Sequence, residues 1–408
     1  MKRLPALAAT LALGTAFTTQ AHALEADAFA ERLKAAFEAQ SLTLAYNGAT
    51  VDGEDVVLSN LKLGVQDLQT DDELPNLTFE EVRFEDVTET DGGGYRVGRV
   101  GRNDVSYDIP EIGPEDEQAS FTIAEWAFEG ITIPGTEPTG PLAPFGDGAV
   151  LIERAFLNDM QFKLAGEDYV SLASAEYTTD VSDTTLSTSG SFTDMVVDLS
   201  VSADRSEDLK EWIDGTGISS LNIDAETDST WNLETGALDQ PTFRVALDGL
   251  GSANLEMSLG GVTSQFAQAA MDIGEQMENA TAQQQQALGL QMMGLAAQLQ
   301  FGGVEFTYDD DGLGDKIIPY YAEIDGQSKE ELVQEVAAVL PRVLSQLQAP
   351  ELQAQIEEAV TSFLNDPQSF TVSLKPDAPV PFAALAAAAT QPAQLFQALN
   401  AQVNANSQ

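Results

Sequence analysis

The chain has 408 residues, with 66 acidic and 18 basic side chains, a formal net charge of −48, one histidine and no cysteine. Affinity for nucleic acid depends on cations that neutralise phosphates, so this charge excludes nucleic acid as a partner. The absence of cysteine excludes thiol chemistry, disulfides and a lipid-modified N-terminal cysteine. Hydrophobic residues make up 43% of the chain, which is ample material for a folded core.

The first 23 residues predict a secretory signal peptide that is cleaved after Ala23. Lys2 and Arg3 supply the positive start, residues 4–17 form a short apolar run, and Ala21-His22-Ala23 has the small-x-small form of a cleavage site. The apolar run is too short for a bilayer core of ~30 Å. We therefore expect a soluble periplasmic protein that is not integral to the membrane.

Cleavage would remove the only histidine and leave 16 basic side chains (18 less Lys2 and Arg3) against 66 acidic ones, a formal charge of −50. Without histidine and cysteine, a Ser-His-Asp triad, a Cys-His pair and the usual zinc site are unavailable. The sequence therefore assigns no catalytic residue, no metal ligand and no cofactor.

One short phrase recurs along the chain, with apolar residues at positions i, i+3 and i+5. Three copies also share an ED, EG or ND pair and a closing Val, Ile or Met at i+8: LTFEEVRFEDV (77–87), FTIAEWAFEGI (121–131) and VLIERAFLNDM (150–160). Looser copies have the triplets Leu58/Leu61/Leu63, Leu172/Ala175/Tyr177, Phe192/Met195/Val197, Ile218/Leu221/Ile223, Leu250/Ala253/Leu255 and Phe301/Val304/Phe306.

The spacing indicates strands with an irregularity in them. Residues of the same parity share a face of a strand, so position i lies opposite i+3 and i+5 unless a β-bulge adds one residue. Repeated bulges make a sheet curve. We predict an α+β fold with a strongly curved antiparallel β-sheet of irregular bulged-strand repeats, and amphipathic helices at the N-terminus and in the C-terminal third. The alternative is an ordinary antiparallel sheet with irregular strand entries.

Further local signals place turns and helices. Asn47-Gly48 predicts a β-hairpin, and residues 221–247 read as three strands broken at Thr235-Gly236 and at Pro241. Apolar periodicity predicts helices over 25–40, 262–299 (a helical hairpin or one long helix), 328–347 and 350–364, a strand at SFTVSLKP and a weakly helical tail. Ser328 and Glu331 form a capping box, and Pro341 should kink or end its helix.

These signals divide the chain into four parts. Residues 1–23 are the signal peptide, 24–261 an N-terminal helix with the repetitive sheet, 262–300 an Ala/Gln/Met-rich helical insertion, and 301–408 a mixed α/β part that completes the same domain.

Clustered arginines form the first candidate site. Arg96, Arg99 and Arg102 lie within seven residues, and their planar guanidinium groups suit a phosphate or carboxylate headgroup. The alternative is that they pair with acids on neighbouring strands.

An apolar groove is the second candidate site. Its predicted lining is Phe79, Val82, Phe84, Ile123, Trp126, Phe128, Met277, Met292 and Met293. The methionines would give an adaptable apolar surface, although a plain helix–sheet interface would have the same composition.

The acidic segment YDDDGLGD (308–315) offers oxygen ligands for calcium from Asp309 to Asp315. Consecutive aspartates point in different directions, which favours a hairpin turn at Asp311-Gly312. Paired carboxylates for glycoside hydrolysis cannot be selected among 66 acids.

The repeated strand phrases VVLSNLKLGV (56–65), LTFEEVRFEDV and FTIAEWAFEGI, with the closing NDPQSFTVSLKPDAPVPFAAL (365–385), resemble AsmA-type and related uncharacterised envelope proteins of Gram-negative bacteria. The resemblance implies a β-groove with an apolar interior and a role in lipid movement or envelope maintenance.

The sequence thus predicts a non-enzymatic periplasmic protein that holds a lipid or acyl chain, or an extended segment of an envelope protein partner, in an apolar β-groove. The alternative from another class is a structural or protein-interaction module with a filled core and no ligand. A hydrolase that uses a pair of carboxyl groups (an acid-acid hydrolase) is the third and least favoured hypothesis.

Overall fold

The computed structural model describes residues 24–40, 42–65, 77–90, 92–112, 117–136, 149–182, 184–203, 205–278 and 280–407. The predicted signal peptide, residues 1–23, lies outside this part of the chain. Among the described residues, every helix is too short or too polar to cross a bilayer.

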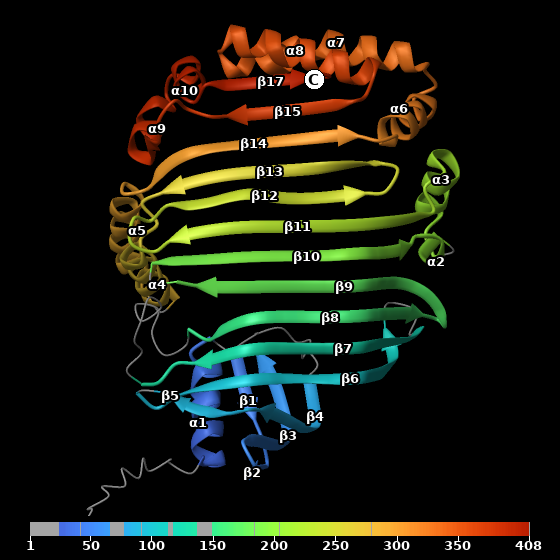
Figure 1. The fold of residues 1–408 in the computed structure, drawn as a ribbon. Helices are drawn as coiled ribbons and strands as arrows, with labels where there is room; N and C mark the ends of the chain where they lie inside the picture. The colour runs from blue at the N-terminus through green and yellow to red at the C-terminus, as the bar shows by residue number, and fades with distance from the viewer. Residues whose placement is uncertain are drawn as a thin grey trace, which may run out of the picture.

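The fold is α+β and, within the described residues, is dominated by one open antiparallel sheet of 17 strands (Figure 1). The strands are β1 (Leu42–Ala45), β2 (Gly48–Asp52), β3 (Asp55–Val65), β4 (Leu77–Glu85), β5 (Thr88–Thr90), β6 (Gly94–Ile112), β7 (Glu117–Ile133), β8 (Leu151–Leu164), β9 (Glu167–Val181), β10 (Thr185–Asp198), β11 (Ser220–Asn232), β12 (Leu238–Leu247), β13 (Gly251–Gly260), β14 (Gln300–Asp310), β15 (Ser369–Leu374), β16 (Val380–Pro381) and β17 (Ala401–Ala405).

The strands follow one another through the sheet almost in chain order. From β6 to β15 each strand pairs with the next one, and β17 pairs with β15 at the far edge. At the other end β1 and β2 both pair with β3, β3 pairs with β4, and β4 and β5 lie along β6. In the described part of the chain, helices lie in three of the connections from β6 to β15, namely those between β10 and β11, between β13 and β14, and between β14 and β15.

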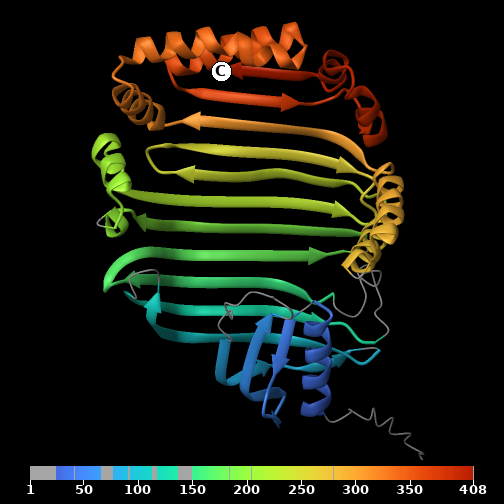
Figure 2. The same ribbon diagram turned by 180° about the vertical axis from the view of Figure 1, so that it is seen from behind.

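The helices lie around the borders of the sheet (Figures 1 and 2). They are α1 (Ala26–Glu38), α2 (Ser200–Ala203), α3 (Glu207–Thr216), α4 (Ser264–Glu278), α5 (Ala282–Ala296), α6 (Leu313–Ile324), α7 (Lys329–Leu344), α8 (Pro350–Asn365), α9 (Phe382–Ala388) and α10 (Pro392–Ala398). Helices α4 and α5 stand at one end of the long strands, and α2, α3 and α6 stand at the other end. Helices α7 and α8 follow the β17 edge, and α1 lies beside the first strands.

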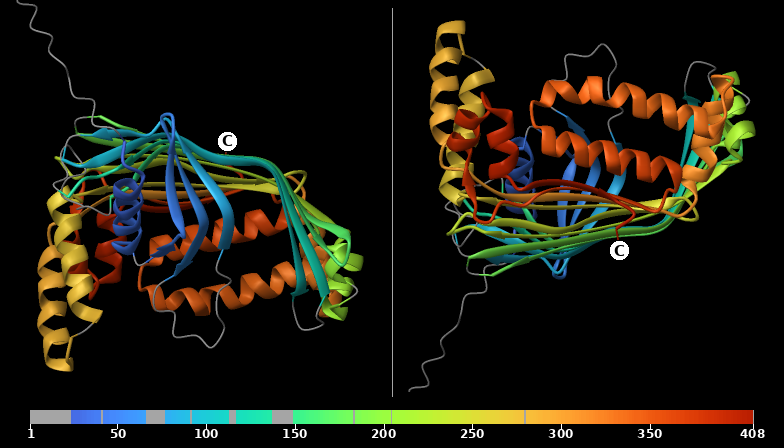
Figure 3. Two further views of the ribbon diagram at one scale, coloured as in Figure 1. Left: turned by 90° about the horizontal axis from the view of Figure 1, so that it is seen from below. Right: turned by 90° about the horizontal axis from the view of Figure 1, so that it is seen from above.

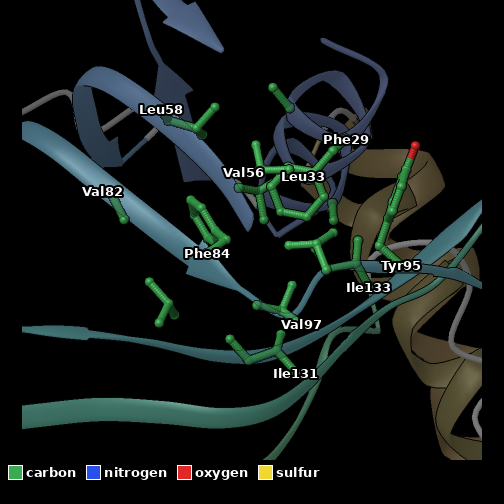
Figure 4. Close-up of a cluster of buried hydrophobic side chains, with 14 of the residues drawn as sticks. Phe29, Leu33, Val56, Leu58, Val82, Phe84, Tyr95, Val97, Ile131 and Ile133 are labelled. Atoms are coloured by element: carbon green, nitrogen blue, oxygen red, sulfur yellow. The ribbon is translucent and has the colours of Figure 1, made fainter. Parts of the chain in front are cut away.

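The larger hydrophobic core lies where α1 packs on the first strands (Figure 4). Phe29 is fully buried, and its ring lies 5.2 Å from the ring of Phe84 and 5.2 Å from that of Tyr95, both in edge-to-face geometry. Val56 and Val97 are also fully buried there. A smaller core lies between α8 and β17, around Ala349, Leu352, Ala359 and Val403.

Several recurring triplets coincide with a break in the strand. Asn60 (φ 49°) lies inside the triplet Leu58/Leu61/Leu63, and Asp194 (φ 52°) lies inside Phe192/Met195/Val197, where the pairing of β10 with β11 shifts register. The three strongest copies carry a left-handed residue in their ED, EG or ND pair: Asp86, Gly130 and Asp159. Aspartate, asparagine and glycine are the residues that enter this conformation most readily.

Some of these breaks line up across neighbouring strands. Asp104 (φ 53°) on β6 and Asp159 (φ 49°) on β8 both lie opposite Ala124 of β7. The residues before and after each of them pair with Glu125 and Ile123, the two neighbours of Ala124. The pairing is therefore interrupted in phase on adjacent strands, without the added residue that the predicted β-bulge would bring. Register shifts inside a triplet occur between Phe192 and Met195 and between Phe301 and Gly303.

Several local predictions are confirmed. The helix predicted over 25–40 is α1, and the segment 262–299 forms the hairpin of α4 and α5. The capping box of α7 is present, with the Glu331 N–H donating to Ser328 Oγ at 3.2 Å and the Ser328 N–H to Glu331 Oε2 at 2.9 Å. The helix predicted over 350–364 is α8.

Other local predictions are wrong, and for Asn47-Gly48 and Pro241 pairing between strands prevails over the local signal. Asn47-Gly48 does not close a hairpin, because β1 and β2 both pair with β3. Of the two outcomes predicted for Pro341, a kink or an end of the helix, the end is wrong, because the helix continues to Leu344. Pro241 lies inside β12 at a register shift, so residues 221–247 form two strands instead of three.

The core around Phe29 gives a stability prediction. Phe29→Ala removes a fully buried ring between two aromatic partners, and we expect it to lower the free energy of unfolding in urea by about 3–5 kcal/mol. Lys34→Ala, on the half-exposed side of the same helix, should cost about 0.5 kcal/mol or less. Equal effects of the two substitutions would contradict the placement of α1.

The left-handed residue in β8 gives a second prediction. In a regular strand Asp159→Val would stabilise, because valine favours extended backbone. At φ 49° it should instead lower the free energy of unfolding by about 1–2 kcal/mol, while Asp159→Gly should change it by about 0.5 kcal/mol or less. A valine variant more stable than the glycine variant would rule out the break.

Candidate functional site

Four rows of apolar side chains cross the long strands, each made of residues that pair directly between neighbours and so share a face. The first row is Trp126, Leu157, Ala175, Phe192, Ala225, Val245, Ala253, Tyr308 and Phe370. The second is Phe84, Val100, Phe128, Ala155 and Tyr177. The third is Val105, Ile123, Met160, Leu172, Met195, Ile223 and Leu247. The fourth is Tyr107, Phe121, Phe162, Val170, Val197 and Leu221.

The strand breaks bring all four rows to one face. A hollow on the opposite face is lined by consecutive residues, Asp104 after Asn103, Glu125 after Ala124 and Asp159 after Asn158. Such neighbours would point to opposite faces of a regular strand. In each of these three strands, two consecutive residues therefore face the hollow. The alternation of side chains is shifted by one residue there, so Ile123, which precedes Ala124, lies on the same face as Trp126. We call the surface formed by the four rows the apolar face.

Helices cover the apolar face at both ends of the sheet. At one end Phe29 of α1 packs on Phe84, the first member of the second row. At the other end the Phe363 ring of α8 lies 6.0 Å from Tyr308 and 5.9 Å from Phe370, the last members of the first row. Figure 3 shows α1, α8 and the α4–α5 pair on the same side of the sheet.

The middle of the apolar face is open. Strands β8 to β12, which the structure describes from end to end, contain no buried residue, and the described helices leave the broad centre of the sheet free in Figures 1 and 2. Phe128 is 38% exposed and Tyr177 is 44% exposed, although both lie within long strands. The open middle of the apolar face is therefore the candidate functional site, since contiguous exposed apolar surface is uncommon on folded proteins.

The other face of the same strands is polar. Hydroxyl pairs cross it, with Ser174 Oγ 2.8 Å from Thr193 Oγ1 and Thr178 Oγ1 3.0 Å from Ser189 Oγ. Arg154 donates to Glu176 at 2.7 Å, and this bond raises the pKa of the guanidinium and lowers the pKa of Glu176. The sheet therefore separates an ionic, hydrogen-bonded face from an apolar one.

The three arginines predicted as an anion site are not brought together. Arg96 makes two hydrogen bonds to Glu153, at 2.7 and 3.0 Å, and Arg99 donates to Glu125 at 3.0 Å. Arg102 lies in register with Trp126. A bound anion would have to displace Glu153 and Glu125, so for Arg96 and Arg99 the geometry favours the alternative, in which arginines pair with acids on neighbouring strands.

The nine residues predicted to line a groove lie under α1 at the covered end of the apolar face, on the open part of that face, and on the α4–α5 hairpin. Val82 and Phe84 are buried under α1, with Phe79 packed against them. Ile123, Trp126 and Phe128 belong to the open apolar face. Met277 (38% exposed) and Met293 (63% exposed) lie with Met292 on the α4–α5 hairpin. The structure therefore offers an open face in place of the single groove that was expected.

The acidic segment 308–315 joins a strand to a helix, so the predicted hairpin turn at Asp311-Gly312 is wrong. The Asp310 carboxylate accepts from the backbone N–H groups of Gly312 at 3.0 Å and Gly314 at 2.9 Å, and from Tyr308 Oη at 2.8 Å. These bonds start α6 directly after β14. In the described part of the chain, no group of three or more His, Asp or Glu side chains converges on a common metal position.

Sequence reasoning missed most members of the apolar face as site residues. Leu157, Leu172 and Phe192 belong to recurring triplets, so the phrase was the available signal. Val245 and Tyr308 belong to the first row because of how β12 and β14 pair with β13. No local sequence pattern predicts that pairing register.

Comparison with known proteins matches the C-terminal part of the chain to a family profile. The profile, described as an uncharacterized protein, matches residues 244–406, from the second half of β12 to the end of β17. No curated protein matches the chain.

The Arg96–Glu153 pair gives a pH prediction. The hydrogen bond from Arg96 lowers the pKa of Glu153 below its ordinary value of 4.5, so the pair stabilises the fold above that value and loses its contribution as the pH falls through the lowered pKa. Because both side chains are 46% exposed, Glu153→Gln should cost at most about 1 kcal/mol at pH 7, and the cost should shrink toward zero at the lowest pH at which the fold persists.

Urea unfolding of both proteins between about pH 3 and pH 8 measures this difference, a range that brackets the ordinary carboxyl pKa. Glu80→Gln, at an exposed glutamate of β4, serves as the control. A cost for Glu153→Gln that does not change with pH would contradict an ionic pairing.

Proposed function

We propose that the protein is a non-enzymatic binding protein that holds an acyl chain of a lipid on the apolar face. The observation that carries the proposal is the open middle of that face, where four rows of apolar side chains remain half-exposed between ends that α1 and α8 cover. A monomeric soluble protein seldom leaves so large an apolar surface bare.

The chemistry of the face selects an apolar ligand. Hydroxyl and ionic side chains cross the other face, where they are already paired with one another. An acyl chain needs no hydrogen bonds, and each of its methylene groups gains about 0.8 kcal/mol when it leaves water.

The dimensions also suit an acyl chain. The first row runs from β7 to β15, and strands lie about 4.8 Å apart, so the row spans about 38 Å. One leaflet of a bilayer core is roughly half of ~30 Å thick. The row is therefore longer than one extended chain from a membrane lipid.

A strongly curved sheet belongs to the same proposal. The register shift between Phe192 and Met195, with the left-handed residue Asp194 inside it, supports a bend in β10, because bulges increase twist and bend their strands. Strands β6 to β8 turn toward the helices at one end in Figure 3. With helices on its borders, such a sheet would form a trough. The periplasmic location, the resemblance to AsmA-type proteins and a role in envelope maintenance remain predictions of the sequence.

The test combines ligand recovery with direct binding. Protein purified from its own host should carry lipid that native mass spectrometry and solvent extraction detect. After delipidation it should bind a fluorescent fatty-acid probe. Repeated recovery without lipid, together with no binding of the probe, would contradict the proposal and favour a protein-interaction module.

A matched pair of variants locates the site. Phe192→Asn places an amide in the open part of the first row, and we expect it to weaken probe binding about tenfold, the effect of ~1.4 kcal/mol. Thr193→Asn, the next residue on the polar face, should change binding less than about twofold, because a change remote from the ligand removes no contact with it. Equal losses in the two variants would place the probe elsewhere.

A further inference from the structure

A second surface lies at the C-terminal edge of the sheet and is independent of the apolar face. Strand β17 pairs with β15 on one side, and no strand in the described ranges pairs with its outer side. The N–H of Asn406 donates to Ser369 O at 3.0 Å, in the register that also pairs Asn404 with Thr371 and Gln402 with Ser373.

This register determines which backbone groups point outward. Hydrogen-bonded and non-hydrogen-bonded pairs alternate along an antiparallel ladder. The bond from Asn406 therefore directs the backbone N–H and C=O groups of Gln402 and Asn404 toward β15 as well. The alternate residues, among them Val403 and Ala405, direct theirs away from β15. An edge strand of this kind is a template for another extended chain.

A pocket of ≈ 650 Å³ lies along this edge. It is lined by the start of α8, by α10 and by β17. Its lining residues are Ala349, Pro350, Glu351, Leu352, Gln355, Ala393, Phe396, Gln397, Asn400, Ala401, Gln402 and Asn404. Figure 3, in the view from above, shows β17 alongside α8 with the α9–α10 pair near one end. A side chain of a strand added to β17 would have this pocket beside it.

The edge lacks the features that normally prevent such pairing. Natural edge strands carry charges, proline or bulges that block another strand. Residues 378–408 contain no charged side chain, in a chain with 66 acidic and 18 basic ones, and β17 itself reads AQVNA. Glu351 is the only charged residue among those that line the pocket in the described part of the chain.

We propose that the β17 edge binds an extended, uncharged or basic segment of another polypeptide, which adds to the sheet as a further strand. Main-chain hydrogen bonds would supply affinity, and the pocket would select the side chain beside Phe396. A basic residue of the segment would lie near Glu351. A second copy of this chain is disfavoured as the occupant, because it would bring a formal charge of −48 to a molecule of the same charge.

The probe is a library of random dodecapeptides displayed on phage and selected on the immobilised full chain. We expect enriched peptides with a medium-sized apolar residue and an excess of Lys or Arg over Asp and Glu. Ala405→Pro removes an outward N–H that β15 does not use, so it should weaken binding of a selected peptide about tenfold, the effect of one lost hydrogen bond of about 1.4 kcal/mol. Ala405→Ser keeps the N–H and should bind within about twofold of the wild type.

A second measurement keeps the proposal testable if the proline variant folds poorly. In a peptide that pairs with β17, every second backbone N–H points toward β17. N-methylation of those amides should abolish binding, whereas N-methylation of the intervening amides should leave it unchanged. The proposal is overturned if no peptide is enriched, if binding is insensitive to N-methylation, or if ultracentrifugation finds a dimer that Ala405→Pro dissociates, since the occupant would then be a second copy.

Discussion

The structure depends on keeping strand breaks in phase across an antiparallel sheet. A slip of one residue in register would move every side chain of a strand to the other face. Left-handed residues such as Asp104 and Asp159 interrupt their strands opposite the same residue of β7, Ala124. Because the interruptions coincide, pairing continues beyond them in the same register, and the apolar residues on both sides of each break remain on one face.

This arrangement separates the two faces over a long distance without a second layer. Paired hydroxyls and Arg–Glu bonds satisfy the polar face, whereas the described helices α1 and α8 cover the apolar face only near its two ends. The open middle is where a ligand would complete the core. The β17 edge is a separate candidate binding surface, because a ligand there would bind to backbone N–H and C=O groups and not to apolar side chains.

The sequence predicted those features that local spacing determines. The recurring triplets gave the strands and their breaks, and periodicity gave α1, the α4–α5 hairpin and α8. It failed where distant pairing decides. Asn47-Gly48 has a hairpin signal, yet β3 pairs with both flanking strands. The glutamates that accept hydrogen bonds from Arg96 and Arg99, Glu153 and Glu125, lie 57 and 26 residues away in the sequence. The apolar face could be predicted only in fragments, because its rows follow from the register.

The most direct test of the central claim uses the absence of cysteine from the chain. Single cysteines at Ala175, in the first row, and at Ser174, on the polar face, would be labelled with a maleimide in protein purified from its own host and again after delipidation. The account predicts that Ala175→Cys reacts slowly before delipidation and much faster afterwards, while Ser174→Cys reacts at one rate throughout. Equal, unchanging rates at the two positions would contradict a ligand on the apolar face.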